Sequence, residues 1–179
     1  MIERTLGIVL SLGLAAGATF VIAARAAAND APATPPNAAA PAATGAANQT
    51  PLQLVASSPK GSLKDPYLGN KQAIAEGAKL FSGYGCPGCH GGGGGGGICP
   101  PLIDGVWIYG GGDDTLFRLI TLGSIDLQKQ GYSRQAIESV VAPMPSFGST
   151  IPKADDIWKI IAWIRSHYDA QGNPLPGNQ

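Results

Sequence analysis

The sequence has little charge of either sign, and the charge that it has is balanced. Only 13% of its residues are charged, and 12 basic residues match 12 acidic ones in number. A domain that binds nucleic acid needs a basic surface to neutralise phosphates, and this chain has no such excess. The composition therefore argues against nucleic acid as a partner.

No stretch of the sequence alternates apolar and polar residues strongly enough to predict a β-sheet. Helical periodicity or helix-capping residues occur instead in four segments: 70–82, 113–123, 133–141 and 154–168. Asp113 or Asp114 is expected to cap the second of these helices, and Ser133 the third. The sequence therefore predicts an all-α fold with about four helices.

An apolar run near the start of the chain predicts export. Residues 6–24 are all apolar or small, lie between Arg4 and Arg25, and are followed by three alanines of the kind that signal peptidase accepts. Residues 1–28 are therefore expected to be a signal peptide, with an uncleaved membrane anchor as the alternative. Both interpretations place the rest of the chain outside the cytoplasm, which predicts a periplasmic protein.

Composition divides the remainder of the chain. Residues 29–59 are rich in alanine and proline and nearly free of large apolar side chains, so a disordered linker is expected there. Residues 60–168 have the length and the apolar content of one small domain, and 169–179 form a short polar tail. So small a domain has a thin core, and a large buried cofactor would stabilise it.

The stretch GYGCPGCHGGGGGGGICPPLIDG, residues 83–105, contains all three cysteines of the chain. No lysine follows its seven glycines, and Pro100 and Pro101 stop a helix, so a phosphate-binding loop is excluded. No strand rich in Val or Ile precedes Cys86, which argues against a thioredoxin-like dithiol. A zinc site would need Cys99 as its fourth ligand, behind a poorly preorganised glycine loop.

The remaining interpretation is Cys-x-x-Cys-His, the attachment signature of haem c. Cys86 and Cys89 would form thioethers with the two vinyl groups of one covalently bound haem, because a two-residue gap spans those vinyls on one helical turn. His90 would then lie under the iron as an axial ligand. Cys99 is left over, and is expected to be either a small buried residue or a dimerising thiol.

The second axial ligand is expected to be Met144. Apart from the initiator Met1 it is the only methionine, and it lies in a loop between Pro143 and Pro145. A methionine in such a rigid loop is a more natural iron ligand than a core filler. His167, near the end of the last predicted helix, is the alternative and would make the iron bis-histidine.

From Asp65 to Tyr168 the sequence resembles the class I c-type cytochromes. In that family a glycine and an aromatic residue precede the haem motif, here Gly77 and Phe81, and an aromatic residue in the last helix packs there, here Trp163. A Gly-Pro-x-Leu segment follows the motif, and its proline carbonyl holds the proximal histidine. The segment CPPL matches that pattern at Pro100 and Leu102, with Cys99 in place of the glycine.

The resemblance implies the cytochrome c fold, about four helices around one haem. Segments 93–120, 144–148 and 155–166 are most similar to the soluble cytochromes that serve dehydrogenases of alcohols, including methanol, that use pyrroloquinoline quinone (PQQ). The chain is thus expected to be a one-electron carrier and not an enzyme. It would pass electrons from such a quinoprotein to a terminal oxidase or another cytochrome of the respiratory chain.

Two alternative functions remain open from the sequence. The chain is alternatively a membrane-tethered haem subunit of an oxidase or dehydrogenase complex, or a haem centre with an open site for ligand sensing or catalysis.

Trp107, Tyr109 and Arg118 are candidates for contacts with the haem propionates, because buried carboxylates need donors or cations nearby. Core packing is the alternative for the two aromatic residues.

Overall fold

The computed structural model describes residues 48–138 and 141–170. The predicted signal peptide or anchor at 1–28, the expected linker as far as residue 47 and the tail from residue 171 lie outside the described residues. Within the described part of the chain, no helix combines the length and the apolar character needed to cross a bilayer.

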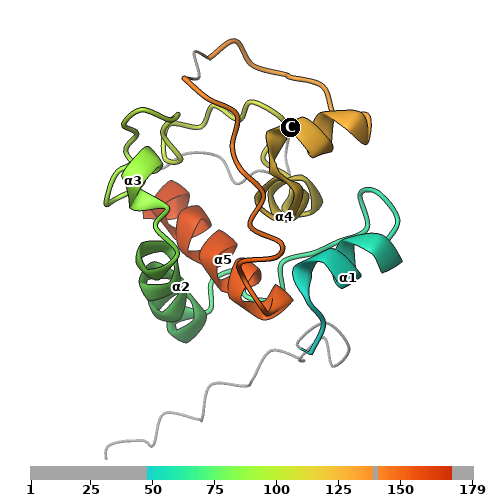
Figure 1. Cartoon of the computed structure of the whole chain (residues 1–179). Helices are drawn as coiled ribbons and strands as arrows, with labels where there is room; N and C mark the ends of the chain where they lie inside the picture. Colours follow the sequence, from blue (N-terminus) through green and yellow to red (C-terminus); the bar gives the residue numbers. More distant parts are fainter. Residues whose placement is uncertain (1–47, 139–140, 171–179) are drawn as a thin grey trace, which may run out of the picture. The chain divides into compact units, whose positions relative to one another are not determined.

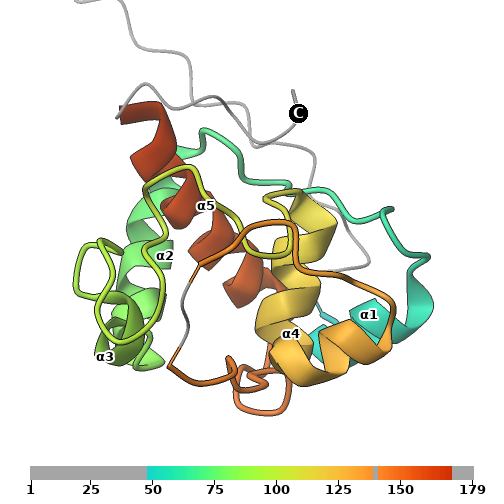
Figure 2. The same ribbon diagram turned by 90° about the horizontal axis from the view of Figure 1, so that it is seen from above.

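The described residues form helices and no strands, which confirms the all-α prediction (Figure 1). In chain order these helices are α1 (Pro51–Ser57), α2 (Lys71–Gly83), α3 (Pro87–His90), α4 (Asp113–Lys129) and α5 (Ala154–Ala170). Seen from both directions, α5 runs alongside α2 on one side and α4 on the other (Figure 2).

Helix α1 lies within the segment that was expected to be disordered through residue 59, so that expectation is wrong for 51–57. Thr50 and Gln53 form a capping box at its start, each side chain bonding the backbone N–H of the other. Leu54 and Val55 are buried against the core. Two neighbouring apolar residues in a segment otherwise rich in alanine and proline were enough to order it, because α4 and α5 offer a surface on which to bury them.

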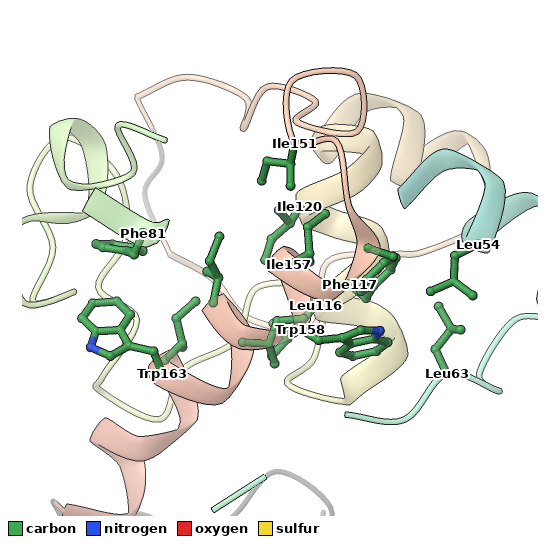
Figure 3. Packing of buried hydrophobic residues seen from close by; sticks show 14 of the residues in the cluster. Leu54, Leu63, Phe81, Leu116, Phe117, Ile120, Ile151, Ile157, Trp158 and Trp163 are labelled. Carbon is green, nitrogen blue, oxygen red and sulfur yellow. The ribbon is translucent and has the colours of Figure 1, made fainter. Parts of the chain in front are cut away.

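Helices α2 and α5 cross where Gly77 removes a side chain from the interface. A Cβ at Gly77 would overlap the carbonyl oxygen of Lys159 and lie 3.0 Å from the Cβ of Trp163. One turn further on, the rings of Phe81 and Trp163 pack with centroids 4.2 Å apart (Figure 3). The crossing at Gly77, with its aromatic pair, is the arrangement that the resemblance implied.

A second layer of the core lies between α4 and α5. The ring of Phe117 packs on Trp158 at a centroid distance of 4.4 Å (Figure 3). Ile157 and Ile161 are fully buried in the same core cluster. Burial of such side chains contributes about 1.5–3 kcal/mol each and is the main force that holds the helices together.

The helix expected from Ser133 to residue 141 is not formed over residues 133–138. The backbone N–H of Gln135 bonds the carbonyl of Ile108, and the side chain of Arg134 bonds the carbonyl of Glu138. The tertiary bond to Ile108, together with the local bond of Arg134, outweighs the helix propensity of a short segment. The cap expected for the preceding helix is also wrong, because Gly112 is the N-cap of α4 and Asp113 lies inside the first turn.

Candidate functional site

One cavity brings together the four residues that were predicted to hold a haem. It has a volume of about 370 Å³, and Cys86, Cys89, His90 and Met144 all lie in its wall. The wall combines segments far apart in the sequence: the turn after α2, helix α3, residues 98–102 and 106–109, α4, the loop around Met144, and α5. A cavity of this size is typical of cofactor sites.

Helix α3 is a single turn that presents the haem motif to the cavity. Its N-cap is Cys86, Pro87 occupies the first helical position, and the N–H of His90 bonds the carbonyl of Cys86 at 3.0 Å. The turn therefore carries both cysteines and the histidine on one short rigid element. Burial raises the pKa of the Cys86 thiol, so this group is neutral in the protein without haem.

His90 is oriented by a backbone carbonyl, as the resemblance implied. Its Nδ1 donates to the carbonyl oxygen of Pro100 at 2.8 Å. This bond requires the hydrogen to be on Nδ1 and leaves Nε2 with a free lone pair. Histidines that bind metal ions typically donate their second ring N–H to such a partner, which sets the tautomer and the ring direction. His90 is thus prepared for a metal bond through Nε2.

The seven glycines, residues 91–97, form a loop that folds back against His90. The N–H of Gly96 bonds the carbonyl of His90 at 2.8 Å, and the N–H of Cys99 bonds that of Cys89 at 3.1 Å. A Cβ at Gly97 would lie 2.8 Å from the carbonyl oxygen of Cys89. The glycines of this loop are absent from the cavity wall, and they allow the close backbone contacts that bring Pro100 to His90.

Met144 lies in the same cavity wall, although it is far from the haem motif in the sequence. It is half-buried and packs against the hydrophobic core. Hydrogen bonds join the main chain around it to α4: the Met144 carbonyl accepts from Ser124 N at 3.0 Å, and Phe147 N donates to the Ile120 carbonyl at 3.0 Å. The loop that carries the predicted axial ligand is therefore tied to a helix.

The structure separates the three lower-ranked candidates. Trp107 and Tyr109 lie in the cavity wall, and the Tyr109 hydroxyl accepts a hydrogen bond from Gln128. Arg118 does not line the cavity, so its predicted contact with a propionate is wrong. Its Nε forms a buried ion pair with Asp114 at 2.9 Å.

Arg118 instead holds the last turn of α1 and the residues that follow it. Its guanidinium donates to the carbonyls of Val55, Ser58 and Pro59. The sequence could not reveal that Arg118 binds these carbonyls, because α1 itself was not predicted.

Arg134 is a residue of the cavity wall that sequence reasoning missed. Among the described residues that line the cavity, it is the one with a fixed charge. It was assigned to a helix, and it reaches the cavity because residues 133–138 form an irregular segment. A guanidinium at the edge of an apolar cavity is suited to a carboxylate, as a haem propionate would be.

The alternative ligand sets receive no support. His167 is absent from the cavity wall; its ring packs edge-on against Trp163, and its Nδ1 lies 2.9 Å from the Trp163 carbonyl. No group of three or more His, Cys, Asp or Glu side chains within 48–138 and 141–170 is placed to hold a metal ion as a zinc site would. All three cysteines are free thiols, and Cys99 is half-buried.

The residues present fit a haem. Leu116, Ile120, Ile160 and Ile164 are among the buried apolar side chains in the wall, which suits a flat apolar macrocycle. An imidazole nitrogen and a thioether sulfur are the donor pair of many c-type cytochromes, and the two thiols lie one turn apart next to the imidazole.

A family model matches the part of the chain that contains this site. The family model described as cytochrome c oxidase, cbb3-type, subunit III matches residues 72–164. No curated protein matches the chain. Among solved structures, cytochrome cL from the marine methylotrophic bacterium Methylophaga aminisulfidivorans MPT is 23% identical, with a TM-score of 0.43, over 70% of this chain and 88% of that one. Because the family model runs from α2 to α5 through the haem motif and spans more than half of the sequence, the chain belongs to this family of cytochrome c domains.

Proposed function

We propose that the chain holds one covalently attached haem c and carries single electrons between a dehydrogenase and the respiratory chain. The observation that carries the proposal is the hydrogen bond from His90 Nδ1 to the Pro100 carbonyl, within a Cys-x-x-Cys-His turn that shares a cavity with Met144. A histidine held in this tautomer is ready to bind iron through Nε2.

Each residue of the cavity then has a distinct part. Cys86 and Cys89 would hold the cofactor in place, His90 and Met144 would bind its iron, and the apolar wall would exclude water. When bound, the haem supplies one-electron chemistry at its iron. Because the protein would supply both of these iron ligands, no site would be left for a substrate, and the chain would be a carrier and not an enzyme.

Replacement of Met144 by alanine tests the axial assignment. We expect the M144A protein to keep its covalent haem but to lose the spectrum of thioether-ligated ferric haem, and its reduction potential to fall, because a methionine ligand raises the potential. Electron transfer to and from partners should slow accordingly. Absorption spectra, redox titration and stopped-flow rates of the purified holoprotein measure these effects. An unchanged spectrum and potential would show that Met144 is not a ligand.

We propose a PQQ-dependent alcohol dehydrogenase as the electron donor and a terminal oxidase or a second cytochrome as the acceptor. This choice rests on the sequence resemblance of 93–120 and 144–148 to cytochromes that serve such enzymes. Export to the periplasm, where these enzymes work, rests on the apolar segment within 1–28.

A stopped-flow experiment tests the donor. The oxidised holoprotein is mixed with a PQQ-dependent alcohol dehydrogenase from the same cell, together with its alcohol, and haem reduction is followed. Fast reduction is the expected result. Reduction by ascorbate without reduction by the dehydrogenase would retain the carrier and discard this donor.

The family description favours a second candidate, a membrane-tethered haem subunit of an oxidase or dehydrogenase complex, since it names an oxidase subunit. Residues 1–28 would then remain as the anchor. Fractionation of cells distinguishes the two: we expect the haem protein in the soluble periplasmic fraction, and its presence in the membrane fraction, in a complex with an oxidase, would establish the second candidate.

A further inference from the structure

Helix α4 is broken at Gly123. This residue has φ 74° and ψ 167°, far from helical values, while the helix continues on both sides from Asp113 to Lys129. A positive φ is a conformation that glycine adopts without strain and that other residues rarely adopt. The sequence predicted a helix that ends at Gly123, and the structure does break the helix there, with a second helical segment that continues to Lys129.

The break frees backbone groups that a continuous helix would use. In an α-helix the carbonyl of Ile120 would accept from Ser124 N, and that of Thr121 from Ile125 N. Here Ser124 N donates to the Met144 carbonyl at 3.0 Å, and the Ile120 carbonyl accepts from Phe147 N at 3.0 Å. The bonds lost within α4 are therefore replaced by bonds to the loop of Met144.

The carbonyl of Thr121 completes this exchange. It accepts from Gly148 N at 2.9 Å and from the Ser146 hydroxyl at 2.7 Å. Pro143 and Pro145, which flank Met144, have no N–H to donate, so the loop depends on these bonds to α4 for its position.

Gly123 also permits the close approach of the loop. A Cβ at this position would lie 2.7 Å from the Met144 carbonyl oxygen, 2.8 Å from Ser146 N and 2.9 Å from the Pro145 carbonyl carbon. All three are backbone atoms, so they cannot turn aside as the end of a flexible side chain can. Any side chain at residue 123 would push the loop away from α4.

We infer that Gly123 is a positioning residue for Met144: the break in α4 holds the main chain of Met144 where its thioether reaches the iron. This inference rests on the proposed function, in which Met144 is an axial ligand. Gly123 touches neither ligand nor cofactor and acts only through the loop, so its effect should appear in the strength of the sulfur–iron bond and in the reduction potential.

The test compares Gly123→Ala with Gly69→Ala in the full-length holoprotein. Gly69 has the same φ of 74°, but a Cβ there meets nothing within 4 Å, so it controls for backbone strain alone. The measurements are the far-red charge-transfer band of thioether-ligated ferric haem, the midpoint potential, and the affinity for added imidazole, which competes with the methionine.

We expect G123A to retain covalent haem, to lose most of the far-red band and to have a lower potential. Imidazole should bind about tenfold more tightly, which corresponds to about 1.4 kcal/mol, because binding releases the strained loop. G69A should match the wild type in all three. The inference would be overturned if G123A kept the far-red band, the midpoint potential and the imidazole affinity of the wild type.

Two further variants remove ambiguity. If G123A does not yield a folded holoprotein, Ser146→Ala is the test, because it deletes the bond to the Thr121 carbonyl without adding atoms. We expect the same shifts in band, potential and imidazole affinity, but smaller. The absence of any shift would contradict the inference. Met144→Ala separates the two proposals. If M144A keeps the wild-type band and potential, the axial assignment itself fails, whereas a changed M144A with an unchanged G123A refutes only the positioning role.

Discussion

At the residue scale, the site depends on a few atoms whose partners are defined. The Pro100 carbonyl determines which nitrogen of His90 carries the hydrogen, and one helical turn sets the spacing of Cys86 and Cys89. Both features are local in the sequence, within 83–105. Residues that depend on distant segments, such as Arg118 and Arg134, were misassigned or missed.

The cysteine pair gives a direct chemical prediction. In the variant with Cys86→Ser and Cys89→Ser, the haem should no longer be attached covalently, because a hydroxyl does not add to a vinyl group as a thiol does. Acid–solvent extraction of the purified protein should then remove the haem, whereas the wild type should retain it. Cys99→Ser is the control and should keep covalent haem. Haem that resists extraction in the double variant would refute the attachment.

Asp65 predicts a dependence of stability on pH. Burial, and secondarily the nearby charge of Asp113, raises the pKa of Asp65 from 3.8 to about 6, against the opposing effects of Tyr67 N and Arg165. Its Oδ2 is buried without a hydrogen-bond partner. Between pH 3.8 and about 6, Asp65 binds more protons in the native state than in the unfolded state. The stability that protonated Asp65 contributes is therefore present below pH 3.8 and is lost as the pH rises through about 6.

Asp65→Asn should remove this contribution. We expect the variant to be more stable than the wild type at neutral pH, by about 1 kcal/mol after allowance for partial exposure, and its stability to vary less over the same pH range. Urea denaturation at a series of pH values measures both effects. Asp104→Asn, at an exposed carboxylate, is the control. A D65N protein with the pH profile of the wild type would contradict the assignment.

At the scale of helices, the α2–α5 crossing and the kink of α4 are both made by single glycines. Gly77 lets α5 approach α2, and Gly123 lets the loop of Met144 approach α4. The first was implied by the resemblance to class I c-type cytochromes, in which a glycine and an aromatic residue precede the haem motif and pack against the last helix. The second was not, since a glycine inside a helical pattern signals a helix end as readily as a bend.

Substitution of Gly77 should separate the two helices. A methyl group at Gly77 would overlap the Lys159 carbonyl and press on Trp163, so α5 must shift. We expect Gly77→Ala to lower the free energy of unfolding by about 3 kcal/mol. Gly83→Ala, at the end of the same helix with open space around it, should change stability by less than about 1 kcal/mol. Chemical denaturation of the two variants measures the difference, and equal stability would argue against a tight crossing.

At the scale of the domain, the cavity is a feature to which several separate segments contribute. Helices α2, α3, α4 and α5 all contribute to its wall, so the packing of the core and the shape of the site are one arrangement. Helix α1 lies outside that wall, and Arg118 connects it to α4.

Haem should be a large part of the stability of the domain. An empty apolar cavity costs about 24 cal/mol per Å³, so an open space of about 370 Å³ would cost several kcal/mol even if its walls partly collapse. This is comparable with the whole stability of a typical domain, about 5–15 kcal/mol. Protein produced without haem attachment should therefore unfold at much lower denaturant concentration than the holoprotein, or without a cooperative transition. Equal midpoints for the two forms would contradict the prediction.

The sequence alone determined the features that depend on short separations: the haem motif and the periodicity of α2 and α5. These follow from covalent spacing and from which residues face one side of a helix. The resemblance to class I c-type cytochromes implied the Pro100 carbonyl behind His90 and the crossing at Gly77. The tertiary structure decided the rest. It ordered α1, kept 133–138 out of a helix, turned Arg118 away from the cavity and broke α4 at Gly123. In each case a distant segment offered buried surface or hydrogen bonds that outweighed the local preference of the chain.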